Sequence, residues 1–204
     1  MKKKVVLILL LISAFNIYVS AQSTMFPRFT MGVEWSYVAT IQHGWHNNFY
    51  TQDGYRINDS DNEFIYHSNA EAYLNFGYNL NENWNIAMYL GIEGIYNLHK
   101  AIPISVRGTY FFGNEHMSDR WFTYIDLGSG IGLKEPLQEI LTGKAGGGYR
   151  ISLSPSTKLD FIASLRMTYT HPYIIYDDEF ITMDKVNRNN SFISALSFGM
   201  ALTF

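Results

Sequence analysis

Apolar and polar side chains alternate with a period of two along most of the chain from Phe29 onward. Breaks rich in Asn, Gly, Asp, Ser or Pro separate the alternating segments. Successive side chains of a β-strand point to opposite faces, so this alternation predicts strands with one apolar face each. Eight such segments follow one another, over residues 29–41, 71–80, 84–97, 104–112, 121–133, 141–153, 159–170 and 192–204.

The two faces of these segments differ in side-chain size as well as in polarity. The apolar face carries bulky rings such as Trp35, Trp84 and Phe161, whereas the other face carries glycines and small polar residues interleaved with charges. Eight strands enclose an interior just wide enough for side chains to fill. We therefore expect the bulky side chains to point outward and the small ones inward. A soluble barrel of the lipocalin type would require the reverse.

An apolar exterior is stable only where lipid replaces water around it. In lipid every backbone N–H and C=O group needs a partner within the protein, so strands must close into a barrel without a free edge. The sequence therefore predicts an all-β fold, an eight-stranded antiparallel up-and-down transmembrane β-barrel.

Each predicted strand carries an aromatic residue near the end that would face the periplasm. Amphipathic rings prefer the headgroup level, and membrane barrels carry aromatic girdles there. We predict that an interfacial aromatic girdle is formed by Phe29, Tyr78, Trp84, Phe112, Trp121, Tyr149, Phe161 and Phe204.

The connections between the predicted strands are of unequal length. Outer-membrane barrels have short periplasmic turns and longer outer loops. The longest breaks, 43–63 and 171–190, are expected to be two long outer loops, although the breaks near 98–101 and 134–139 are shorter than this rule requires. Aromatic residues on exposed loops are typical of binding surfaces, and the alternative is that they pack on one another or on lipid. The candidates for contact with an extracellular ligand are Trp45, Phe49, Tyr50, Tyr55, Tyr173 and Tyr176.

The N-terminal residues have the pattern of a secretory signal peptide. Lys2 to Lys4 are cationic, Val5 to Ile12 are apolar, and Val19 to Ala21 form a small-residue cleavage site. The alternative, a membrane anchor, is disfavoured because the apolar run is short. We expect a signal peptide over residues 1–21 and a barrel domain over residues 22–204.

Composition narrows the function classes. The chain has 204 residues, no Cys and a formal net charge of -3. The absence of Cys excludes disulfides, and the slight negative charge with scattered Lys and Arg argues against nucleic-acid binding. Past the first residues no apolar run approaches the roughly 20 residues of a membrane-spanning helix.

The chain after residue 21 resembles the small eight-stranded outer-membrane barrels of the OmpA/OmpX type. The resemblance rests on the eight alternating segments and on a final strand with Phe198, Met200, Leu202 and Phe204 on one face. It implies a bacterial outer-membrane location and contact with outer-membrane lipid and lipopolysaccharide. It also implies insertion by the barrel-assembly machinery, because such an ending resembles the signal which that machinery reads.

Charged residues recur on the face that is expected to point inward. Unpaired charges in a narrow interior are costly, so we expect the acids and bases to pair. Arg107, Arg150 and Arg166 are expected to bridge carboxylates and close the lumen; a narrow channel lined by charge is the alternative. The predicted lumen charge network comprises Glu34, Glu71, Glu93, Arg107, Asp126, Lys144, Arg150, Asp160 and Arg166.

One short motif bears on catalysis. The string from His67 to Asn69 is similar to the His, Ser and Asn cluster of lipid A deacylase barrels. In that family one residue separates His from Ser in a late strand, whereas here they are adjacent in the second strand and face opposite sides. We therefore assign no catalytic residue. A membrane-embedded lipid A acyl-modifying enzyme remains the alternative to a structural or surface-interaction role.

Two patterns bear on metal binding, and neither carries an assignment. The acidic run over residues 58–63 resembles part of a calcium loop, but Phe64 and Ala70 stand where that loop needs Gly and Glu. Spacing within loops says little about the geometry of a histidine site. We expect no metal and no cofactor, although His43, His46, His67, His99 and His171 all lie near the predicted outer rim.

Overall fold

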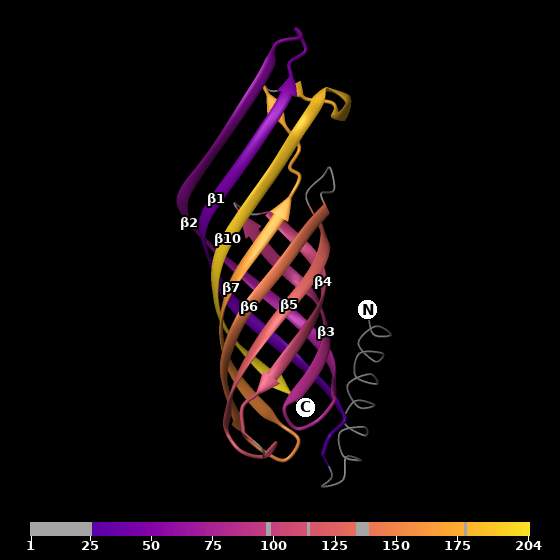
Figure 1. The fold of residues 1–204 in the computed structure, drawn as a ribbon, viewed down its shortest axis with the longest axis vertical. Helices are drawn as coiled ribbons and strands as arrows, with labels where there is room; N and C mark the ends of the chain where they lie inside the picture. Colours follow the sequence, from indigo (N-terminus) through magenta and orange to yellow (C-terminus); the bar gives the residue numbers. More distant parts are fainter. Residues whose placement is uncertain (1–25, 97–98, 114, 134–138, 178) are drawn as a thin grey trace, which may run out of the picture.

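A computed structural model describes residues 26–96, 99–113, 115–133, 139–177 and 179–204 (Figure 1). Its main strands form one closed barrel in the order β1-β10-β7-β6-β5-β4-β3-β2, so strands that are neighbours along the chain are neighbours in space. The predicted all-β, eight-stranded antiparallel barrel is therefore confirmed. The barrel strands are β1 (Phe29–Tyr50), β2 (Arg56–Asn79), β3 (Trp84–Tyr96), β4 (His99–Phe111), β5 (Arg120–Gly132), β6 (Glu139–Ser152), β7 (Lys158–Thr170) and β10 (Val186–Thr203).

A small substructure links β7 to β10. It consists of the two-stranded sheet β8 (Ile175–Tyr176) and β9 (Glu179–Phe180), followed by the 3-10 helix η1 (Met183–Lys185). Among the described residues, no helix has the length and apolarity needed to cross a membrane. The expected signal peptide over residues 1–21 lies outside the described residues.

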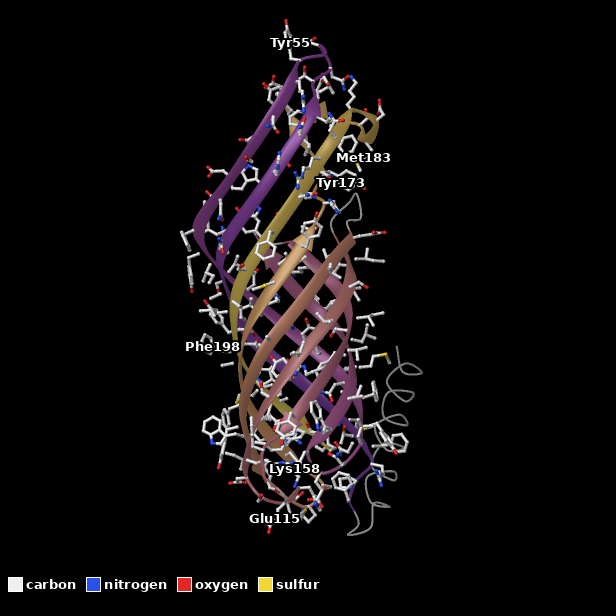
Figure 2. The ribbon with its side chains drawn as sticks, in the orientation of Figure 1. Tyr55, Glu115, Lys158, Tyr173, Met183 and Phe198 are labelled. Carbon is white, nitrogen blue, oxygen red and sulfur yellow. The ribbon has the colours of Figure 1, made fainter. Side chains whose placement is uncertain are left out.

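The barrel exterior is apolar on every strand, as the alternation predicts. Trp121, Ile125 and Leu127 on β5 are 65%, 63% and 67% exposed, while Phe122, Tyr124 and Asp126, which alternate with the outward residues, are buried. Figure 2 shows Phe198 directed away from the barrel wall. Such a surface around a closed barrel suits lipid and not water, which makes this a transmembrane barrel.

The expectation that bulky side chains point outward only was wrong, because the interior holds aromatic rings beside the expected glycines, small polar residues and charges. Five aromatic residues point into the lumen and are buried, and they share strand parity with the inward charges. Glycines make room for them: a Cβ at Gly91 would lie 2.6 Å from the Tyr73 ring, and one at Gly148 would lie 2.8 Å from the Phe122 ring. Inside the barrel, these rings are thus set against glycines. The five inward aromatic residues are Tyr73, Tyr89, Phe111, Phe122 and Tyr124.

Three strands continue well beyond the barrel wall and form a protruding sheet (Figure 1). β3 pairs with β2 only from Glu71 to Asn79, and β7 pairs with β10 only from Ser191 onward. Above these points β1 pairs with β2 on one side and with β10 on the other. We call the part of β1, β2 and β10 beyond the barrel, together with residues 171–185, the head.

The head replaces the two long loops expected from the sequence, and that expectation was wrong. Residues 43–63 form a β-hairpin whose turn includes Gly54 at φ 85°. Most of its positions are polar, so no apolar alternation marks it. Side-chain hydrogen bonds across the strands hold it instead, such as Trp45 to Asp59 at 3.0 Å and His46 to Asn58 at 3.0 Å. Residues 171–190 hold β8, β9, η1 and the start of β10.

A β-bulge at Ile41 separates the barrel part of β1 from the head. Thr40 pairs with Ala195 and Gln42 with Ser194, so β1 carries one extra residue there. An extra residue shifts the alternation of side chains by one position. Odd-numbered residues of β1 therefore point outward below the bulge and toward the concave side of the head above it, as His43 does.

Candidate functional site

Arg107 on β4 is the centre of the lower charge cluster in the lumen. Its guanidinium donates to both carboxylate oxygens of Glu34, at 2.6 and 3.0 Å, and its Nε donates to Asp126 at 3.0 Å. The Tyr89 and Tyr124 rings lie against it, with centroids 3.9 and 4.1 Å from the guanidinium carbon. Because Glu34 belongs to β1, three strands away round the barrel, this cluster spans the lumen.

Glu71 on β2 is the centre of an upper cluster. Its Oε2 lies 2.9 Å from the Lys144 ammonium and 3.2 Å from the Arg166 guanidinium. Arg166 also lies 3.5 Å from Glu93, and the Tyr73 hydroxyl donates to Glu93 at 2.6 Å. Since β2 and β6 lie on opposite sides of the closed ring, the pair of Glu71 with Lys144 crosses the lumen.

A third group of charges occupies the barrel end where the described chain begins and ends. Arg150 binds both oxygens of Asp160 at 2.7 Å. Asp160 lies directly opposite Arg150 on the neighbouring strand β7, so the expectation that Arg150 bridges carboxylates across the lumen was wrong. Arg120 and Lys158 are buried beside this pair, and among the described residues neither has a carboxylate partner. Figure 2 places Lys158 at this end. Neither cation was predicted from the sequence, although Lys158 shares strand parity with Asp160.

All nine charged residues assigned to the lumen from the sequence take part in these ion pairs. The free volume left near the lower cluster is small. A cavity of about 30 Å³ lies beside Glu34, Arg107 and Arg150. Buried ion pairs and rings thus lie inside the tube at two levels.

The eight residues of the predicted aromatic girdle lie at the same end of the barrel as Lys158. Phe29 faces Tyr78 across β1 and β2 with ring centroids 5.2 Å apart, and Trp121 faces Tyr149 at 5.0 Å. Trp84 packs on Tyr110 with ring centroids 5.0 Å apart. Tyr110 was not assigned to the girdle. These three ring pairs lie on the outside of the barrel.

A cleft of about 440 Å³ opens between the concave side of the head and the segment after β7. Trp45 and Asn47 of β1 and Ser191 of β10 line one wall, and Tyr173 and Ile174 line the other. Figure 2 shows Tyr173 beside the protruding strands. The cleft has the size of a small-ligand site.

His43 lies at the centre of this cleft wall. Its Nε2 is 2.9 Å from the Ser191 hydroxyl, and its ring lies 5.1 Å from Trp45 and 4.7 Å from Tyr96. Burial lowers the pKa of His43 from its ordinary 6.5, while the nearby Glu63 carboxylate opposes this shift. Its Nδ1 is buried and has no hydrogen-bond partner within the described part of the chain.

The six predicted binding residues occupy different surroundings. Trp45 and Tyr173 line the cleft. Phe49 is buried in a small core with Ile174 and Ile181, so it was wrong to treat it as an exposed loop residue. The remaining three are exposed strand or turn residues. The ring of one of them, Tyr176, lies 5.8 Å from the buried Phe49 ring. These three are Tyr50, Tyr55 and Tyr176.

The weaker sequence motifs are separated by the fold. His67 points to the concave side and lies 4.7 Å from the Tyr96 ring, whereas the neighbouring Ser68 is on the exposed face. The acidic run over 58–63 is part of strand β2 and not a loop. Within the described ranges, no three His, Asp or Glu side chains converge on a position for a metal ion.

The sequence matches no protein-family model and no curated protein. Solved structures with a similar fold include OprG, an outer-membrane protein of Pseudomonas aeruginosa, with a TM-score of 0.52 and 8% identity over 90% of this chain and 99% of OprG. Neisserial surface protein A has a TM-score of 0.49 and 13% identity over 86% of this chain and 95% of its own. The similarity to OprG shows that the chain has the fold of a small outer-membrane β-barrel.

Proposed function

We propose that this protein is a non-conducting barrel of the bacterial outer membrane which presents an extracellular head for surface interaction, without catalysis. The observation that carries the proposal is the contrast between the two parts of the molecule. The lumen is crossed by buried ion pairs such as Arg107 with Glu34, while the protruding strands hold an open cleft. A closed tube that displays a cleft suits binding better than transport.

The open edge of the head supports an interaction role. On the side away from β1, no described residue pairs with β2 between Arg56 and Ala70. An unpaired strand edge offers backbone N–H and C=O groups to a partner strand. Phe64 and Tyr66 on the convex face are 87% and 69% exposed, which suits contact with lipopolysaccharide or with a protein.

The end of β10 fits the proposed route into the membrane. Phe198 and Phe204 are exposed on the lipid side of this last strand, at 55% and 38%. The resemblance to small outer-membrane barrels makes this strand the segment that the barrel-assembly machinery would bind.

Planar-bilayer recording tests the closed lumen. We expect no sustained conductance from the wild-type protein, and conductance steps from a Glu71→Ala/Lys144→Ala/Arg166→Ala variant, because that variant removes the upper cluster. Slower migration of boiled than of unboiled protein on gels shows that each sample holds a folded barrel. Sustained conductance of the wild type would favour a narrow channel and contradict the proposal.

Mass spectrometry of lipid A separates binding from the alternative, an acyl-modifying enzyme. We expect the same acyl pattern from a strain with the protein and from a deletion strain. A pattern that changes on deletion and returns with wild-type protein, but not with the His43→Ala or the His67→Ala variant, would assign catalysis to this barrel.

A further inference from the structure

The rim of the cleft carries a row of carboxylates. Asp59, Asp61 and Glu63 lie at alternate positions of β2, opposite Asn47, Trp45 and His43 of β1. Their side chains therefore share the concave face of the head with the cleft, and Glu63 lines it directly.

Glu63 is the carboxylate of this row that accepts no hydrogen bond from the described residues. The Asp59 carboxylate accepts a hydrogen bond from the Trp45 indole N–H at 3.0 Å. The Asp61 carboxylate accepts one from the backbone N–H of Asn62 at 2.7 Å. Within the described part of the chain, Glu63 has no cationic partner, and the cleft lining contains neither Lys nor Arg. The negative charge at the mouth of the cleft is thus uncompensated by its walls.

A row of aromatic rings lies next to Glu63 on the cleft side of the head. The Trp45, His43 and Tyr96 rings follow one another at 5.1 and 4.7 Å, and His67 meets the far side of Tyr96 at 4.7 Å. The faces of such rings attract cations, and a planar guanidinium stacks on them particularly well.

The cleft lining also combines an apolar surface with an unused acceptor. Ile95, Ile174 and Ile193 supply apolar surface on which the methylene stem of a long side chain can pack. The side-chain oxygen of Asn47, Oδ1, is buried, and the described residues offer it no hydrogen-bond donor. A buried acceptor without a partner is costly, and a ligand with several N–H donors would remove that cost.

We propose that the cleft binds the guanidinium group of an arginine side chain from an extracellular polypeptide. The guanidinium pairs with Glu63 and stacks on Trp45, and one of its remaining N–H groups donates to Asn47. The stem of the side chain packs on the isoleucines. This inference rests on the proposed binding role of the head and specifies the chemistry that the head recognises.

Methyl NMR of the whole protein in lipid nanodiscs tests this assignment. The isoleucine δ1 methyl groups are labelled, and the protein is titrated with Nα-acetyl-arginine amide or with the uncharged isostere Nα-acetyl-citrulline amide. We expect the arginine compound to shift the Ile95, Ile174 and Ile193 resonances and to bind about tenfold more tightly than the citrulline compound. Equal affinities, or no shift of these resonances, would overturn the proposal.

Variants that differ by one charge supply the control. Glu63→Gln is expected to reduce the affinity for the arginine compound to that for citrulline. Asp53→Asn, in the exposed turn at the tip of the head, removes the same charge and should leave the affinity unchanged. An equal loss in both variants would show a diffuse field effect and not a site. A failure of either kind leaves the bilayer test of the closed lumen unaffected, so the two proposals fail separately.

Discussion

Glu34 on β1 and Arg107 on β4 are joined across the lumen by two hydrogen bonds of 2.6 and 3.0 Å. Both side chains are almost fully buried, at 1% and 3% exposure. A buried charge is tolerated when geometry and additional hydrogen bonds compensate for its lost hydration. Here the bidentate pair, the Asp126 carboxylate and two tyrosine rings provide that compensation, and they join strands that are not neighbours in the sheet.

Replacing Arg107 by Met should therefore destabilise the barrel strongly. The Arg107→Met variant leaves the Glu34 and Asp126 carboxylates buried without their cation. We expect a loss of about 3–5 kcal/mol in the free energy of unfolding, measured by urea titration in lipid vesicles. The exposed Arg188→Met in the head is the control, with an expected change within about 0.5 kcal/mol. Similar values for the two variants would show that the lumen pair contributes little to stability.

Two glycines of the barrel should respond in opposite ways to the same substitution. A Cβ at Gly148 would lie 1.9 Å from the Phe161 carbonyl oxygen, whereas a Cβ at Gly108 would have no atom within 4 Å. Gly148→Ala must push β6 from β7 and is expected to cost about 1–3 kcal/mol. Gly108→Ala should be neutral or stabilise by up to about 1 kcal/mol, because it restricts the unfolded chain. Urea midpoints of the two variants check this contrast.

The head should weaken in mild acid because of His43. Burial lowers the pKa of His43 below 6.5, its value in the unfolded chain. The unfolded chain therefore binds a proton at a higher pH than the folded head, so stability is complete above pH 6.5 and falls as the pH drops below it. Glu63 opposes this shift and His67 adds to it.

Hydrogen exchange of the Trp45 indole N–H, corrected for intrinsic pH dependence, measures this weakening. We expect faster exchange below pH 6.5 in the wild-type protein. The dependence should disappear in His43→Gln and persist in His46→Gln, whose histidine lies on the other face of the same strand. An unchanged dependence in His43→Gln would assign the effect to another group.

The predicted aromatic girdle should stabilise the barrel by anchoring it at the bilayer interface. Trp121 is 65% exposed and packs on Tyr149 at 5.0 Å. We expect Trp121→Ala to lower the free energy of unfolding in lipid vesicles by about 1 kcal/mol or more, through loss of the ring pair and of the interfacial anchor. Tyr55→Ala at the tip of the head removes an equally exposed ring outside the membrane and should have no effect. Equal effects would argue against a girdle.

The barrel itself was predictable from the sequence because its chemistry is periodic. Alternation of residues such as Trp84, Ile86 and Met88 with polar neighbours identifies a strand, and the excess of bulky rings on one face identifies the lipid side. The inward charges followed from the same parity. The ion-pair partners of these charges could not be predicted in this way, because pairs such as Glu71 with Lys144 join strands on opposite sides of the barrel.

The head escaped sequence analysis for two physical reasons. Its strands carry mostly polar residues on both faces, so side-chain hydrogen bonds such as Gln42 to Asn62 replace the apolar periodicity that marks a strand. The alternation also slips by one position at Ile41, which reverses the side on which His43 and Trp45 lie.

The amino-acid sequence alone thus determined that the chain closes into a lipid-facing barrel with charges inside, because a repeated pattern of two is a local property. The tertiary structure alone decided which charges meet, and it decided that His43, Glu63 and Ser191 come together at one cleft. Such contacts depend on strand register and on a single extra residue, and neither leaves a mark in the local pattern.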